Sequence, residues 1–181
     1  MSGTRLNKYI ASSGICSRRK ADELIENGSV MVNGKIVTEL GYLVQEKDKV
    51  FVDKKLIHPV KHEYYRFYKP AGYITTCDDE KGRKTIYDIL PDNLAGLKPV
   101  GRLDKDSTGL LILTNDGDLI NALTHPSVKV PKVYMVTVNA EVKRAELEKM
   151  ANGIEIEKDK IAYADIQVLE IDSKHTEMLI T

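Results

Sequence analysis

The residues whose types and spacing could do chemistry lie in a short loop, residues 101–109, which reads GRLDKDSTG. Asp104 and Asp106 are close together there, and Arg102 and Lys105 flank the first of them. A carboxylate among charges of both signs has the composition of a group tuned for nucleophilic or acid–base work. Spacing alone leaves three alternatives open: a catalytic loop, a paired-carboxylate hydrolase site and an ordinary charged surface loop.

A cluster of cations lies near the N-terminus. Arg18, Arg19 and Lys20 follow Ser17, which can cap a helix, so the three cations fall in the first turn of that helix. The helix dipole disfavours positive side chains at this position and favours phosphate groups. The pattern therefore favours nucleic-acid binding over a solvated run of charge, and three further cations extend the candidate site: Arg5, Lys8 and Lys35.

Two short helices and a β ribbon are expected to position this cluster within residues 1–60. Apolar residues at helical spacing predict helices over 6–14 and 17–28, each ended by a glycine. Asn33-Gly34 lies between alternating apolar residues, which is a strong hairpin signal, and residues 50–57 supply further strand. These elements make a compact helix-rich module.

Strands and helices are mixed in residues 61–181, which contain the charged loop. A turn at residues 69–72 (KPAG) follows a β-prone run rich in tyrosine, and the loop leads directly into an apolar strand at 110–113. The other predicted elements are helices at 116–123 and 142–150 and strands at 64–68, 73–76, 133–138, 161–171 and 177–180. The predicted fold class is α+β, a small helix-rich module followed by a mixed, mainly antiparallel sheet.

The charge distribution also predicts two domains. Basic and acidic residues are equal at 27 each, but residues 1–60 carry 10 basic and 7 acidic side chains, so the zero is a cancellation of +3 by −3. Pro59 favours an extended chain just before residue 60, where we place the boundary. A chain with no long apolar run and no signal peptide is expected to be cytoplasmic and to bind no membrane. Cys16 and Cys77 are too far apart to suggest a metal or redox pair.

Residues 5–55 resemble the S4 RNA-binding domain. The resemblance rests on three motifs: RLNKYI at 5–10, GICSRRKAD at 14–22 and VNGK at 32–35. In that family the helix pair and its basic start contact RNA, which implies the same role for the cations above.

Residues 61–181 resemble the catalytic domain of the RNA pseudouridine synthases, in the RsuA-type ribosomal RNA branch that carries an N-terminal S4 domain. The motifs are GRLD at 101–104 with STGLLILTNDG at 107–117, YKPAGY at 68–73 and KVYMV at 132–136, all in the order of the family. The resemblance implies a synthase that isomerises a specific uridine of ribosomal RNA, with no cofactor and no metal. Its partner would be ribosomal RNA or a pre-ribosomal particle.

The resemblance also implies roles for particular residues. Asp104 would be the essential carboxylate, acting at the sugar either as nucleophile or by assisting proton removal, after the target base is flipped out of the RNA. Tyr134 would stack on the flipped uracil and could take the proton from its carbon five, although the spacing of Tyr134 alone is typical of a half-buried strand residue. Arg102 would reach a phosphate or fill the gap in the RNA. Arg66, Lys105 and Lys132 are candidate phosphate contacts. Lys69 is counted with the RNA-binding residues too, but Lys69 and Pro70 are expected to shape the site more than to react.

A rival hypothesis is a non-catalytic RNA-binding protein with an incomplete synthase domain. In the family the chain continues past the equivalent of Thr181 into a Gly-Arg-rich segment, which holds a basic partner of the catalytic aspartate and a further strand. We therefore expect this sequence to be truncated at its C-terminus, with an open sheet edge.

Overall fold

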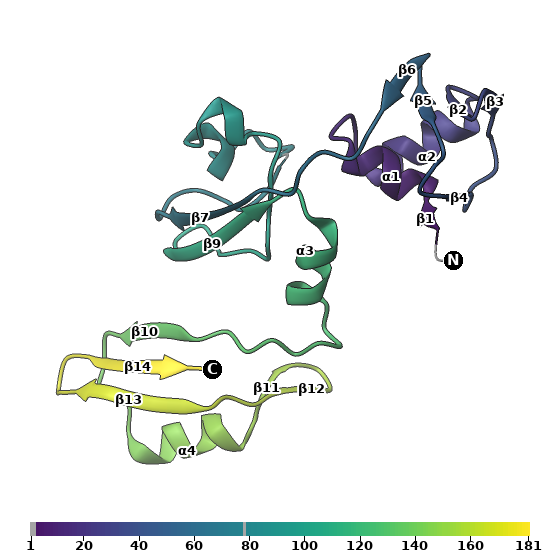
Figure 1. The fold of residues 1–181 in the computed structure, drawn as a ribbon. Coiled ribbons are helices and arrows are strands. Elements are labelled where there is room, and N and C mark those ends of the chain that lie inside the picture. Colours follow the sequence, from purple (N-terminus) through teal and green to yellow (C-terminus); the bar gives the residue numbers. More distant parts are fainter. Residues whose placement is uncertain (1–2, 78) are drawn as a thin grey trace. The chain divides into compact units, whose positions relative to one another are not determined.

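The computed structural model describes residues 3–77 and 79–181. It contains two compact units, Met1–Val128 and Lys129–Thr181, each of which is described by itself (Figure 1). The domain boundary predicted near residue 60 falls inside the first unit, between two separate clusters of buried apolar side chains, and it stays a prediction. No helix among the described residues is long and apolar enough to cross a membrane.

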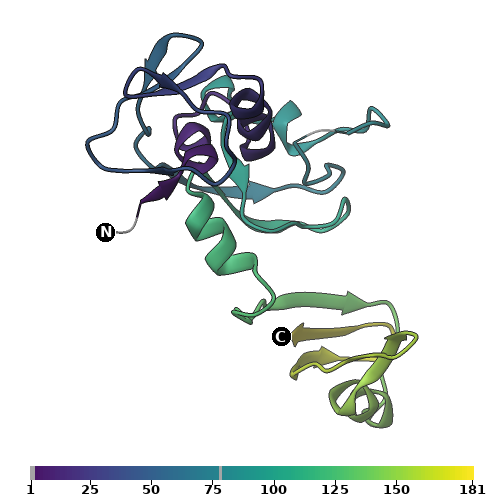
Figure 2. The same ribbon diagram turned by 90° about the vertical axis from the view of Figure 1, so that its right-hand side faces the viewer.

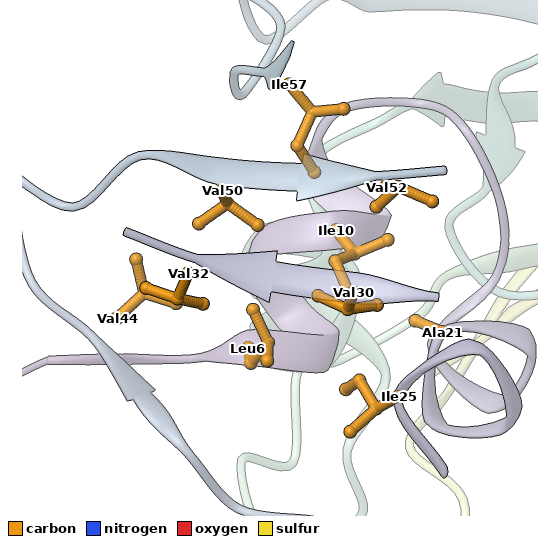
Figure 3. Close-up of a cluster of buried hydrophobic side chains, with 10 residues drawn as sticks. All are labelled: Leu6, Ile10, Ala21, Ile25, Val30, Val32, Val44, Val50, Val52 and Ile57. Atoms are coloured by element: carbon orange, nitrogen blue, oxygen red, sulfur yellow. The ribbon is translucent and has the colours of Figure 1, made fainter. Parts of the chain in front are cut away.

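The N-terminal module packs two helices against a small sheet. Its ten buried apolar residues come from both helices and from the strands, so that the side chains converge between them (Figure 3). The Asn33-Gly34 turn has positive φ at both residues, 52° and 79°, as a tight two-residue hairpin requires. The elements are β1 (Thr4–Arg5), α1 (Leu6–Ser12), α2 (Arg18–Glu26), β2 (Val30–Val32), β3 (Lys35–Ile36), β4 (Leu43–Val44), β5 (Val50–Val52) and β6 (Lys55–Ile57), with sheet orders β3-β2-β5-β6 and β1-β4.

A three-stranded antiparallel sheet follows the N-terminal module in this unit. Its order is β7-β9-β8, with β7 at Tyr64–Lys69, β8 at Lys98–Pro99 and β9 at Gly109–Thr114. One face of β9 is buried through Leu111 and Leu113, which pack with Ile86 from the 3-10 helix η1 (Ile86–Asp88) and Leu97, which follows η2 (Asp92–Leu94). The helix α3 (Gly117–Thr124) follows β9. The rigid strand β9 thus begins directly after the charged loop.

The second unit is a sheet with one helix. Its strands are ordered β10-β14-β13, all antiparallel, and α4 (Arg144–Asn152) lies beside this sheet (Figure 2). A cavity of about 360 Å³ is lined by apolar residues of α4 and of the two strands β10 and β14. The strands are β10 (Tyr134–Val138), β11 (Ile154–Glu157), β12 (Lys160–Ala162), β13 (Ile166–Ile171) and β14 (Thr176–Ile180), with β11 and β12 forming a separate hairpin.

The predicted α+β class and its mainly antiparallel sheet are confirmed, and three local expectations are wrong. Residues 73–76 form no strand, because only Ile74 makes a single bridge to Thr85. The strand expected at 161–171 is two strands, because the chain leaves strand conformation at residues 163–165: β12 pairs with β11, whereas β13 pairs with β14. The last strand, β14, is not an open edge: it is paired on both sides, and the edges belong to β10 and β13.

Asp116 caps α3 and links it to β7. Its carboxylate accepts hydrogen bonds from the backbone N–H groups of Asp118 and Leu119, at 3.0 and 3.1 Å, and from the Tyr64 hydroxyl at 2.9 Å. These hydrogen bonds hold the pKa of Asp116 below its usual value, and the bond from the Leu119 N–H has the largest effect. The carboxylate form is therefore favoured by folding.

We expect Asp116→Ala to lower the free energy of unfolding by about 1 kcal/mol, the typical cost of a lost helix cap. Because the folded pKa of Asp116 is lowered, its contribution is complete above roughly pH 4 and is lost as the pH falls through the folded value. Asp116→Asn keeps a cap but cannot titrate, so it should lack this part of the acid dependence. Urea unfolding at neutral and acidic pH measures both effects, and equal acid sensitivity in wild type and Asp116→Asn would contradict the assignment.

Candidate active site

The loop that carries Asp104 joins β8 to β9. Gly101 and Gly109 bound it and both have positive φ, 81° and 140°, a region that side chains with a Cβ rarely adopt. Within the loop the backbone N–H of Ser107 donates to the carbonyl of Asp104 at 3.2 Å, which closes a turn. The two glycines and this turn fix where Asp104 lies at the start of β9.

The Lys69 side chain binds the backbone of this loop. Its side chain is fully buried, and its Nζ lies 2.7 Å from the Asp104 carbonyl and 2.8 Å from the Ser107 carbonyl. The carbonyls of Pro70 and Lys105 are each 3.2 Å from the same nitrogen. An ammonium has three donors, so the loop carbonyls use all of its hydrogen-bonding capacity.

This position corrects one expectation and supports another. Lys69 was expected among the RNA-binding residues, but a fully buried ammonium enclosed by four carbonyls does not reach RNA. The expectation that Lys69 shapes the site agrees with the geometry. Burial lowers the pKa of Lys69, and the negative charges of Asp106 and Asp104 act in the opposite direction.

The turn after β7 makes a second hydrogen-bonded contact with the same loop. The backbone N–H of Gly72 donates to the Lys105 carbonyl at 2.8 Å, and Gly72 has φ of 91°. The KPAG motif therefore acts as a unit: the lysine side chain and the glycine amide both bind the backbone around Asp104. This explains why the two motifs occur together although they are about 30 residues apart.

A cavity of about 560 Å³ opens beside Asp104. Its lining brings together Arg102, Asp104 and Lys105 from the loop with two more cations, Lys81 and Arg83. Asp79 also lines it and binds the Arg83 guanidinium at 2.6 Å, so part of that charge is neutralised. Glu80 lines the cavity as well, so its wall carries four cations and three carboxylates. A polar wall with several cations suits a phosphate-bearing substrate.

Tyr134 and Lys132 belong to the second unit. Tyr134 is the first residue of the edge strand β10, pairs with Ile180 and is 46% exposed. Its ring is therefore available for stacking. Lys132 precedes this strand and its Nζ donates to the Val130 carbonyl at 2.7 Å. The structure describes these residues within their own unit, and their expected roles beside Asp104 stay predictions.

The basic start of α2 has the geometry that the sequence predicts. The Ser17 hydroxyl accepts the Lys20 backbone N–H at 3.2 Å, which caps the helix, and Arg18 and Arg19 are exposed in its first turn. Lys20 pairs with Glu23 at 2.6 Å. Arg5 and Lys35 are exposed on β1 and β3, whereas Lys8 pairs with Asp118 at 2.6 Å.

Metal-ligand side chains gather at one place among the described residues, the turn between β13 and β14. Potential ligand atoms of Glu170, Asp172 and His175 lie within 4.8 Å of one another there. The Asp172 carboxylate accepts the backbone N–H groups of Lys174 and His175, which accounts for its position as part of the turn. This exposed group lies in the second unit, away in sequence from the residues assigned to the active site.

Sequence reasoning missed Thr75. Its side chain is buried and hydrogen-bonds to the backbone of Leu103, next to Asp104. A threonine within a predicted strand, here 73–76, is typical of strand composition and carries no functional signal, so only the tertiary contact identifies it.

Comparison with known proteins identifies the class. Residues 63–181 match the family described as RNA pseudouridylate synthase, and residues 4–50 match the S4 domain. The chain belongs to the RNA pseudouridylate synthase family, as its motifs predict, and it combines the synthase domain with an S4 domain.

Individual relatives agree with this assignment. The chain is 42% identical over 176 residues to ribosomal large subunit pseudouridine synthase B of Bacillus subtilis (strain 168), covering 97% of this chain and 72% of that protein. It is 42% identical over 158 residues to dual-specificity RNA pseudouridine synthase RluF of Escherichia coli (strain K12), covering 86% and 53%. A solved structure, described as a crystal structure of pseudouridylate synthase, matches with a TM-score of 0.61 and 30% identity over 97% of this chain and 76% of that chain.

We expect Lys69→Met to destabilise the first unit and to reduce activity. Methionine keeps the length of the side chain but leaves the four carbonyls without a donor, which should lower the free energy of unfolding by on the order of 2 kcal/mol. Lys61→Met is the matched control, because Lys61 is exposed and its loss should change stability by less than about 0.5 kcal/mol. Urea unfolding measures the difference, and equal stability of the two variants would contradict the assigned role of Lys69.

Proposed function

We propose that this enzyme converts a specific uridine of ribosomal RNA to pseudouridine, with Asp104 as the essential carboxylate. The observation that carries the proposal is the Asp104 loop, held by Lys69 and Gly72 beside a cation-lined cavity. The similarity to a ribosomal large subunit pseudouridine synthase favours the RNA of the large subunit as the target.

The reaction requires the base to leave the RNA stack, because the sugar carbon and the uracil are not accessible within folded RNA. Asp104 then acts at the sugar as the glycosidic bond to N1 breaks, and the uracil turns and rejoins through its carbon five. Carbon five loses its proton, which Tyr134 takes in this proposal, and N1 gains one, so the product is an isomer of the substrate. A loop that is held by its backbone carbonyls leaves the carboxylate free for this work. No cofactor is needed, since the product is an isomer of the substrate.

Other residues of the site bind and orient RNA in this proposal. Arg102 contacts a phosphate or fills the gap that the flipped base leaves, and Lys105 adds positive charge to the same cavity. Tyr134 stacks on the uracil from β10, and Lys132 contacts a phosphate. Residues 1–60 act as a docking domain for structured RNA or a pre-ribosomal particle, and residues 61–181 carry the chemistry.

We expect Asp104→Asn to abolish pseudouridine formation, with a fall in kcat of more than about a thousandfold, while the Kd for RNA stays the same. Asp106→Asn is the matched control, since Asp106 lies in the same loop but does not line the cavity. Mass mapping of pseudouridine in ribosomal RNA, incubated with each purified chain, gives the readout. Retained turnover in Asp104→Asn would overturn the catalytic assignment, and RNA binding without turnover in the wild type would favour the rival binding-protein hypothesis.

We expect replacement of both Arg18 and Arg19 by Ala to weaken RNA binding and to change chemistry little. Loss of two phosphate contacts should reduce the slope of log K against log salt by roughly 1.5. Lys54 and Lys55 replaced by Ala are the control pair, because they are exposed cations at the turn between β5 and β6 and do not belong to α2. Filter binding across a salt series measures the slope, and an unchanged slope would show that α2 does not contact RNA.

A further inference from the structure

Thr75 binds the residue that precedes the catalytic aspartate through both of its backbone polar groups. Its hydroxyl donates to the Leu103 carbonyl at 2.8 Å and accepts the Leu103 N–H at 3.2 Å. The residue is 7% exposed, so neither bond is replaced by water at little cost. One hydroxyl therefore fixes both backbone polar groups of Leu103.

Thr75 is itself anchored to the core of the unit. The neighbouring residue Ile74 donates its backbone N–H to the Lys84 carbonyl and accepts that of Ile86, each at 3.0 Å. Ile86 is completely buried in the second apolar cluster. The hydroxyl is thus attached to a rigid part of the structure, as a group that orients another must be.

The attachments of the loop are made to its backbone before, at and after Asp104. Thr75 holds the backbone just before Asp104, and Lys69 holds the carbonyls of Asp104 itself and of Ser107 after it. With the backbone held at both ends, the direction of the Asp104 side chain is restricted toward the cavity that it lines. Lys69 and Gly72 bind the loop at Asp104, Lys105 and Ser107, whereas Thr75 binds it at Leu103.

We propose that Thr75 is a positioning residue for the isomerisation, which sets the placement of Asp104 through the Leu103 backbone. Thr75 also lines the cavity, but both hydrogen bonds of its hydroxyl are made to Leu103. This inference rests on the proposed function of Asp104. A displacement of about 1 Å at a reacting group costs on the order of a hundredfold in rate, so loss of this hold affects kcat and leaves RNA affinity unchanged.

The test compares Thr75→Val with Thr75→Ser in the whole chain. Valine has nearly the shape of threonine but lacks the hydroxyl, so kcat should fall by roughly ten- to a hundredfold while KM for the RNA stays the same. Serine keeps the hydroxyl and should restore most of kcat. Rescue by serine separates positioning from packing, because serine lacks the methyl group that a packing role would need.

Thr114→Val is the matched control for lost stability. Thr114 is also a buried threonine whose hydroxyl donates to a carbonyl, that of Glu63, and accepts a backbone N–H, that of Asp116. It lies at the far end of β9 from the Asp104 loop. Thr114→Val should lower Tm as much as Thr75→Val does but leave kcat within about threefold of the wild type.

Three outcomes would overturn the inference: an unchanged kcat in Thr75→Val, a rise in KM that accounts for the whole loss, or an equal loss of kcat in Thr114→Val.

If the wild-type chain forms no pseudouridine, the proposed function fails on that result alone. Amide hydrogen exchange then tests whether Thr75 restrains the loop backbone. Faster exchange at Leu103 and Ser107 in Thr75→Val, with wild-type rates in Thr75→Ser, supports the positioning role, and equal rates in all three chains refute it.

Discussion

The Lys69 ammonium inside the first unit is the interaction on which the site depends. Buried backbone carbonyls need hydrogen-bond donors, and a short loop offers few of its own. The Lys69 ammonium supplies these donors. A buried cation is costly unless it is saturated with acceptors. Here the loop supplies the acceptors and the lysine supplies the donors, so each stabilises the other.

This arrangement explains how a single short loop can be both exposed and rigid. The face of the loop toward the core is held through its backbone by Lys69, Gly72 and Thr75. The other face keeps its side chains for the cavity. Backbone contacts hold a loop without using its side chains, so the residues of the GRLD motif are available for substrate.

The zero net charge of the chain results from an uneven distribution of charge between its two parts. The excess of positive charge in residues 1–60 includes Arg18 and Arg19 at a capped helix start, where the dipole adds to the attraction for phosphate. The remainder of the chain is acidic overall, yet four cations line its cavity. RNA attraction is therefore concentrated at two places and is not a property of the whole surface.

The sequence by itself determined the family, the α+β class, the helix start at Ser17, the Asn33-Gly34 hairpin and the loop that carries Asp104. These features follow from local rules, since caps, tight turns and apolar periodicity depend on residues near one another in the chain. Only the tertiary structure decided that Lys69 is buried, that Thr75 binds Leu103, that residues 161–171 divide into two strands and that β14 is central. Each of these depends on contacts between segments far apart in sequence, and the side-chain types of a lysine or a threonine do not reveal which distant backbone groups they will meet.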